Sequence, residues 1–194
     1  YQNTSTSSDF DYLYRNLDKK MSVALHSLTE FVLNDLLKER TGLLRNLEVD
    51  VHLKHHSHEG EAEISSDTNK YRPRKFKVYV DHHRLEKDDY GRVKDDTEWA
   101  HDVMKTLVHE LVHVRDYVLG RLTFRRWSWR DSVSFEDNGL FWDGVHYDAG
   151  NLKEYYELPY EIEAYGRERG LLVSFLAFWN EVEKKFGDEL KNLS

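Results

Sequence analysis

The sequence from Thr106 to Tyr117 reads T-L-V-H-E-L-V-H-V-R-D-Y, and at its centre is an H-E-x-x-H motif. On a helix, residues four apart lie on one face, so His109 and His113 can offer two imidazole nitrogens to one ion. Glu110 lies beside them, placed to take a proton from a metal-bound water. Two histidine ligands, a carboxylate base and an open position for water are typical of hydrolytic zinc sites.

The residues around the motif predict an amphipathic helix with one apolar stripe. The stripe consists of residues at helical spacing: Ala100, Val103, Met104, Leu107, Val108, Leu111, Val112 and Val118. Asp95, Asp96 and Thr97 are candidate N-terminal caps, and Gly120 is a candidate C-terminal stop. The alternative is a helix whose two histidines lie at a wet boundary and bind no metal. We favour metal binding.

The composition indicates one folded domain with a substantial core. The chain has 194 residues, including five Trp, twelve Tyr and nine Phe, and it has no Cys. Any zinc must therefore be held by histidine and carboxylate ligands. No stretch reaches the length of a membrane span and no signal peptide is evident, so we expect a cytoplasmic protein that does not enter membranes.

The charge argues against nucleic acid as a general partner. The formal net charge is -8, whereas nucleic-acid binding relies on neutralising phosphates. Two basic segments, residues 70–77 and 121–130, qualify this expectation, because the second also carries aromatic residues that can stack on single strands. For both segments we favour solvated strand edges and loops around a cleft.

The N-terminal part predicts a long helix. Apolar residues recur at steps of three and four from Phe10 to about Arg40, and Thr41-Gly42 ends the pattern. A helix of this length is expected to be kinked or split. Residues 1–9 are polar and are predicted to form a flexible segment.

The next part predicts a small, mostly antiparallel sheet. From Leu47 the hydrophobic period changes from helical spacing to two, which is typical of half-buried strands. Strands are expected around residues 47–54, 61–65 and 75–82.

The part after Gly120 combines an extended segment, turns and helices. We expect an extended segment over residues 121–129, turns at Asn138-Gly139 and Asp143-Gly144, a helix over 160–169 that Pro159 begins and Gly170 breaks, and a further helix over 171–186. The chain shows no repeat and no linker. We therefore predict an α+β fold with a single domain over residues 10–194.

A catalytic zinc takes three protein ligands, so the two motif histidines need a third partner. No histidine follows His113 closely, and the only later one is His146. The better candidate segment is Leu158–Tyr165, because it offers Glu161 and Glu163 on a predicted helix. The small Ala164 allows two helices to approach.

The H-E-L-V-H motif followed by P-x-E-x-E-A resembles the gluzincin type of zincin metallopeptidase, closest to the compact bacterial and phage-type members with an E-x-x-A helix. The resemblance covers about residues 10–170, and it implies a zincin-like fold that hydrolyses peptide bonds with Zn²⁺. It places the third ligand at Glu161, with Glu163 as the alternative; a capping carboxylate is the competing interpretation of Glu161. Larger gluzincins have an acidic residue four after the ligand, which orients a histidine. Here that residue is Tyr165, so the orienting residue is unassigned.

A protein or peptide substrate is expected to bind beside the metal as an added strand, and the segment Lys75–Val80 is the predicted edge that receives it. Glu110 would act as general base. Candidates to polarise the scissile carbonyl or hold the oxyanion are Tyr155, Tyr156, Tyr160 and His146. The histidine-rich residues 52–58 are an alternative metal site, but a solvated turn is favoured.

Two other functions are considered. One is a non-catalytic binding or structural protein with a zincin fold, of the phage or mobile-element type; the intact Glu110 argues against it. The other is an SprT-like protease that acts on DNA-bound proteins. That family uses a third histidine and usually adds a nucleic-acid module, and neither is evident here.

Overall fold

The computed structural model describes residues 7–54, 60–69, 71–82, 96–125 and 139–192. Its helices are α1 (Ser7–Leu36), the 3₁₀ segment η1 (Lys38–Asn46), α2 (Asp96–Leu119), α3 (Leu152–Tyr156) and α4 (Pro159–Asn192). Its strands are β1 (Glu48–Lys54), β2 (Gly60–Ile64), β3 (Lys75–Asp81), β4 (Leu122–Arg125), β5 (Gly139–Trp142) and β6 (Val145–His146). The predicted α+β class is confirmed. None of the helices in the described part of the chain has an apolar stretch of the length that a bilayer crossing requires.

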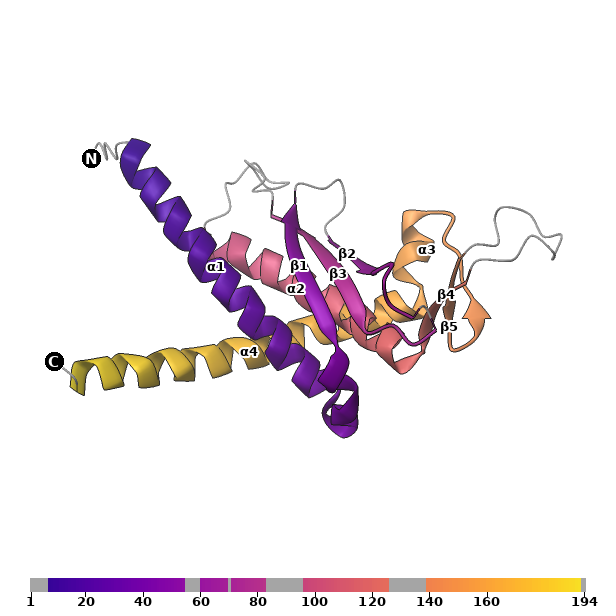
Figure 1. Cartoon of the computed structure of the whole chain (residues 1–194). Helices are drawn as coiled ribbons and strands as arrows, with labels where there is room; N and C mark the ends of the chain where they lie inside the picture. Colours follow the sequence, from indigo (N-terminus) through magenta and orange to yellow (C-terminus); the bar gives the residue numbers. More distant parts are fainter. Residues whose placement is uncertain (1–6, 55–59, 70, 83–95, 126–138, 193–194) are drawn as a thin grey trace.

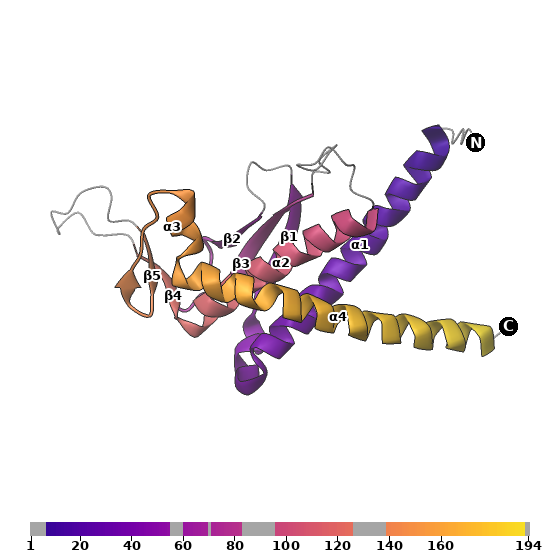
Figure 2. The same ribbon diagram turned by 180° about the vertical axis from the view of Figure 1, so that it is seen from behind.

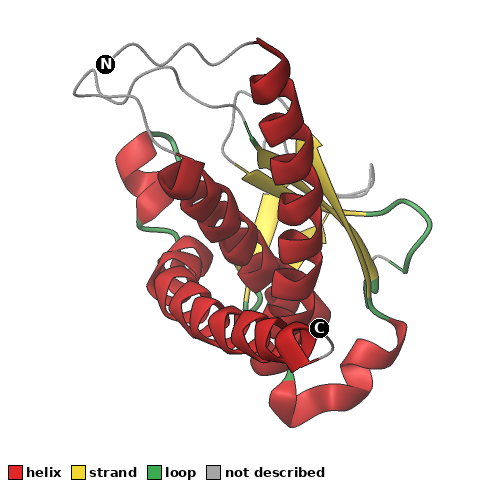
Figure 3. Cartoon of the chain, turned by 90° about the vertical axis from the view of Figure 1, so that its left-hand side faces the viewer, coloured by secondary structure: helices red, strands yellow, loops and turns green. Residues whose placement is uncertain are grey.

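Helix α2, which carries the H-E-x-x-H motif, is the centre of the fold. In Figure 1 strands β1, β3 and β2 lie in front of α2, and from behind, in Figure 2, α4 lies in front of it. Figure 3 shows the helices gathered on one side of the strands. Because α2 is covered on several sides, every residue from 107 to 118 is buried. The helix is therefore more deeply buried than the single apolar stripe predicts.

The first sheet has the strand order β1-β3-β2. β3 pairs in parallel with β1 and antiparallel with β2, so the prediction of a mostly antiparallel arrangement is wrong for this sheet. β3 lies at the centre, and its inward residues Phe76, Val78 and Val80 are only 1%, 0% and 0% exposed. The segment Lys75–Val80, predicted to be a substrate-binding edge, is thus the central strand. The edge strands of this sheet are β1 and β2, and each has one side that pairs with no other described strand.

The second sheet is antiparallel throughout, in the order β4-β5-β6. The predicted turn at Asp143-Gly144 joins β5 to β6, and both residues have positive φ, 47° and 85°, as a type I′ turn requires. The predicted extended segment is confirmed over Leu122–Arg125. Its continuation from residue 126 and the predicted turn residue Asn138 lie outside the described residues.

The N-terminal helix differs from its predicted limits. It runs from Ser7 to Leu36 rather than from Phe10 to Arg40, and η1 follows it with a break at Arg40 (φ -137°, ψ 46°). Residues 7–9 of the segment predicted to be flexible belong to this helix, and residues 1–6 lie outside the described part.

Gly170 does not break the C-terminal helix, so that prediction is wrong. Helix α4 continues from Pro159 to Asn192. Leu171, Leu172 and Phe175 follow the glycine and are buried in the core. Their burial outweighs the roughly 1 kcal/mol that a glycine costs inside a helix.

Helix α2 ends where Gly120 predicts. Gly120 has a φ of 75°, and its backbone N–H donates to the carbonyl of Tyr117 (3.1 Å) while that of Arg121 donates to the carbonyl of Asp116 (2.9 Å). This pair of bonds is a Schellman C-cap, which favours glycine at the left-handed position. The cap turns the chain directly into β4.

Candidate metal centre

Three side chains converge where α2 packs on α4. His109 and His113 lie one turn apart on α2, and Glu161 is in the first turn of α4. One ligand atom from each lies within 4.8 Å of the others, and the three residues are 6%, 8% and 4% exposed. With Glu168, described below, they form what we call the metal cluster.

The distances between the donor atoms fit a tetrahedral cation. The Nε2 atoms of His109 and His113 are 3.2 Å apart. Glu161 places Oε2 3.0 Å from Nε2 of His109 and Oε1 3.3 Å from Nε2 of His113. Ligands at zinc bond lengths of about 2.0–2.2 Å around a tetrahedral ion stand about 3.3 Å apart. Two imidazoles and one carboxylate are also a donor set that Zn²⁺ accepts.

His109 lies between two carboxylates. Its Nδ1 is 3.0 Å from Oε2 of Glu168, and its Nε2 is 3.0 Å from Oε2 of Glu161. If Nδ1 donates its proton to Glu168, the lone pair of Nε2 faces the lone pairs of Glu161. Such an arrangement needs either a second proton or a metal ion between the two atoms.

The pKa shifts of His109 and Glu161 also favour a positive charge on the imidazole beside the ionised carboxylate. Burial lowers the pKa of His109, but its hydrogen bonds to Glu161 and Glu168 outweigh that effect and raise the pKa to about 9. Burial raises the pKa of Glu161, but hydrogen bonds from His109 and His113 lower it to about 2. Without a metal, a proton on His109 offsets part of the negative charge of these carboxylates.

Glu168 was not singled out from the sequence, although its position carried a signal. It lies seven residues after Glu161, which is two turns further along the same face of α4. The position four after Glu161, where the resemblance leads one to look for an acidic residue, holds Tyr165. The Tyr165 ring packs against the ring of His109, with centroids 4.5 Å apart.

Glu163 points away from the metal cluster. Its carboxylate accepts hydrogen bonds from Arg115 (2.6 Å) and Arg121 (2.9 Å), and it lies 3.3 Å from Nε of Arg167. Arg115 also lies 2.7 Å from the fully buried Asp116. We call these five residues the arginine cluster. Between the two clusters Ala164 is 0% exposed, in agreement with the small residue expected where α4 meets α2.

Glu110 lies at the wall of a large cavity and next to strand β2. The cavity has a volume of about 1080 Å³, and Glu110, His113 and Glu161 line it together with β2. A Cβ atom on Gly60, at the start of β2, would lie only 2.7 Å from Oε1 of Glu110. Burial raises the pKa of Glu110, the charges of the two histidines oppose this, and those of Glu161 and Glu61 add to it.

The four oxyanion candidates occupy different places. Tyr155 and Tyr160 line the cavity beside Glu161. The Tyr155 hydroxyl is within hydrogen-bonding reach of Glu161, and burial together with that carboxylate raises the pKa of Tyr155 far above its usual range. Tyr156 is half exposed and packs against Tyr155 and Tyr165, outside the cavity lining. His146 is exposed on β6, against Phe141.

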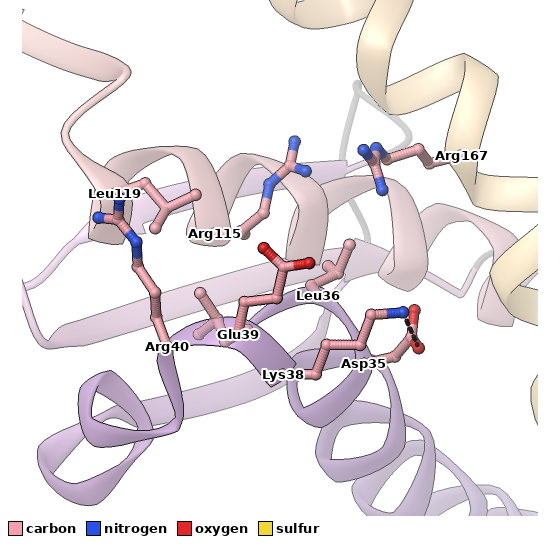
Figure 4. A pocket seen from close by; sticks show the side chains of 9 residues that line it. Asp35, Leu36, Lys38, Glu39, Arg40, Arg115, Leu119 and Arg167 are labelled. Carbon is pink, nitrogen blue, oxygen red and sulfur yellow. Dashed lines mark hydrogen bonds and ion pairs between the residues drawn. The ribbon is translucent and has the colours of Figure 1, made fainter.

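Elsewhere in the described part of the chain, no comparable set of metal ligands is found. A second cavity, of about 360 Å³, lies between the end of α1, η1 and α2; Arg115 from α2 and Arg167 from α4 line it (Figure 4). Its charges are mixed, with Lys38 paired to Asp35 at 3.5 Å. In the histidine-rich segment, His52 stacks on Tyr79, and residues 55–59 lie outside the described part.

Comparisons with protein-family models, with curated proteins and with solved structures found no match for this chain.

Proposed function

We propose that this protein is a zinc-dependent metallopeptidase. The observation that carries the proposal is the convergence of His109, His113 and Glu161 on one point, with Glu110 beside it on the wall of a large cavity. Bound there, Zn²⁺ would supply Lewis acidity that polarises a scissile carbonyl and makes a water more acidic. A metallopeptidase with this motif would have a zincin-like fold. The cytoplasmic location expected from the sequence stays a prediction.

Glu110 is suited to move the proton of the attacking water. It is 6% exposed and follows the ligand candidate His109 on α2, with Gly60 of β2 close to its carboxylate. A carboxylate with a raised pKa is a better proton acceptor at neutral pH than a fully solvated one. Glu110 would take the proton from water and pass it to the leaving amine.

Strand β2, rather than β3, is suited to hold the substrate backbone. Its unpaired edge lines the cavity from Gly60 to Ile64, so an extended peptide can add to it as a further strand. Gly60 lies against Glu110, so a peptide bound along β2 would have its backbone close to the base. Of the tyrosines, Tyr155 and Tyr160 are the ones placed to donate a hydrogen bond to the carbonyl oxygen.

The two other functions fit the site less well. A non-catalytic zincin-fold protein has no need for Glu110 at the wall of an open cavity. An SprT-like protease that acts on DNA-bound proteins needs a basic surface near its site, whereas the charged residues that line this cavity within the described chain are carboxylates.

The test compares three proteins purified with one zinc per chain. Glu110→Gln should keep its zinc and its fold but lose turnover on denatured casein or a random peptide library by about 10²-fold or more, because the base is removed. Glu181→Gln, an exposed substitution on α4, is the matched control and should cleave like the wild type. Zinc-loaded wild type that cleaves none of these substrates, or Glu110→Gln that cleaves equally fast, would overturn the proposal.

A further inference from the structure

The cavity beside the metal cluster is strongly acidic. Four glutamates are among its lining residues, and no Lys or Arg is among those that the structure describes. Glu161 and Glu110 already have roles as ligand and base. Glu61 and Glu63, both on the edge strand β2, remain.

The two remaining carboxylates lie on the same face of β2. Alternate residues of a strand point to opposite faces, and Gly60 faces Glu110 on α2. Glu61 and Glu63 therefore point to the outer face of the sheet. Both are exposed. Side chains of a peptide paired with β2 would lie about 5 Å from them on that face.

The two glutamates differ in their neighbours. Glu63 lies opposite Lys77 of β3, whereas Glu61 lies opposite Tyr79. Glu61 has no ion pair in the described part of the chain, and its charge reaches Glu110. The Lys54 ammonium lies 3.9 Å from the centroid of that Tyr79 ring, so both glutamates have a lysine on the neighbouring strands. Glu61 differs from Glu63 in its position, because it directly follows Gly60, the residue that faces Glu110.

Exposed aromatic rings add a second feature that suits a cation. Tyr71 and Phe124 line the same cavity and are 77% and 47% exposed. Aromatic faces attract ammonium and guanidinium groups and pack against the aliphatic stems of Lys and Arg. A negatively charged peptide segment would instead be repelled by the four glutamates of the cavity lining.

We propose that the cleft selects an extended polypeptide with Lys or Arg within two residues of the scissile bond, and that Glu61 is the residue that recognises the cation. This inference rests on the proposed peptidase function and names its substrate class.

The experiment uses mass spectrometry to map the sites at which the zinc-loaded protein cleaves a random peptide library. Wild type should cut within two residues of Lys or Arg. The readout is the ratio of kcat/KM for a Lys-containing peptide to that for a neutral peptide. Glu61→Gln should lower this ratio about three- to fivefold, and Glu61→Lys about tenfold or more. Glu63→Gln, two residues further from Gly60 along β2 than Glu61, is the matched control and should change this ratio less. The preference should weaken in about 0.5 M NaCl.

The outcomes separate this inference from the proposed function. Cleavage without a basic preference, or a basic preference that survives Glu61→Lys, overturns the role of Glu61 and leaves the peptidase intact. If the zinc-loaded protein cleaves nothing, the peptidase proposal fails. In that case, fluorescence anisotropy measures the binding of labelled Lys-rich and Glu-rich peptides of equal length, which tests whether the cleft selects cations. Equal binding of the two overturns it, and binding of the Lys-rich peptide that Glu61→Lys abolishes supports it.

Discussion

Two groups of charged side chains join α2 to α4, and they balance their charges in different ways. In the arginine cluster, the carboxylates of Glu163 and Asp116 face the guanidinium groups of Arg115, Arg121 and Arg167. Those cations are charged at every accessible pH, so the cluster needs no added ion. In the metal cluster, two carboxylates face two histidines, whose charge depends on protons or on a bound metal ion.

The position around the helix decides which cluster a residue joins. Glu161 and Glu163 are two residues apart on α4, so their side chains point about 200° apart around its axis. Glu161 therefore reaches the histidines and Glu163 the arginines. One helix thereby carries a candidate metal ligand and a structural anchor two residues apart in the sequence.

The largest expected effect separates the two carboxylates by metal content. Glu161→Ala should purify with less than about a tenth of a zinc per chain, because only two protein ligands remain. Glu163→Ala should keep about one zinc, since its carboxylate points at Arg115 and Arg121. Elemental analysis after dialysis against added zinc measures both. Retention of zinc by Glu161→Ala together with its loss from Glu163→Ala would reverse the roles assigned to the two clusters.

The next effect concerns folding. Glu163→Gln should lower the free energy of unfolding by about 2–3 kcal/mol, because the buried Arg115 loses a charged partner. The loss should be the same with and without zinc. Urea denaturation measures it, and Glu181→Gln on the exposed side of α4 should stay within about 0.5 kcal/mol of the wild type. A loss that appears only in the zinc-loaded protein would mean that the arginine cluster also supports the metal site.

Much of this arrangement could be predicted from the sequence, because it depends on local spacing. The spacing of His109 and His113, the stop at Gly120 and the turn at Asp143-Gly144 are each fixed within a few residues. The choice between Glu161 and Glu163 was reached through the resemblance, since spacing alone leaves both near the start of α4.

The remaining features depend on contacts between distant segments. β3 lies at the centre because it buries more apolar surface against α2 than the neighbouring strands do. The alternation of residues within one strand does not show how its burial compares with that of the others. The pairing of Glu168 with His109 spans 59 residues and requires the crossing of α2 and α4. Gly60 is a similar case, because its contact with Glu110 exists only once β2 lies at the sheet edge.

A smaller effect tests whether Glu168 orients His109. Glu168→Ala should weaken zinc binding about 10- to 100-fold, because the imidazole loses the partner that fixes its tautomer. Glu168→Gln can still accept the Nδ1 proton and should lose less. Competition with a chromophoric chelator measures both affinities. Equal losses in the two variants would point to packing rather than to the hydrogen bond.

The smallest effect uses pH to compare the clusters. In the metal-free protein the pKa of His109 is raised to about 9, so at pH 7 its Nε2 carries a proton that zinc must displace. Zinc affinity should therefore rise about tenfold per pH unit between about pH 7 and 8.5, or about 1.4 kcal/mol per unit. The stability of the metal-free protein changes in the opposite direction with pH. The stabilisation from charged His109 is complete below its ordinary pKa of 6.5 and is lost as the pH rises through about 9.

The arginine cluster contributes no such change over this range, because burial raises the pKa of Asp116 only to about 6 and the arginines stay charged. The difference in Tm between zinc-loaded and metal-free protein should thus widen from pH 7 to 8.5. Calorimetry on both forms measures this difference, and Glu163→Gln should leave its slope unchanged. A difference in Tm that stays constant over this range would show that no proton is displaced, and the charge balance assigned to His109 would be wrong.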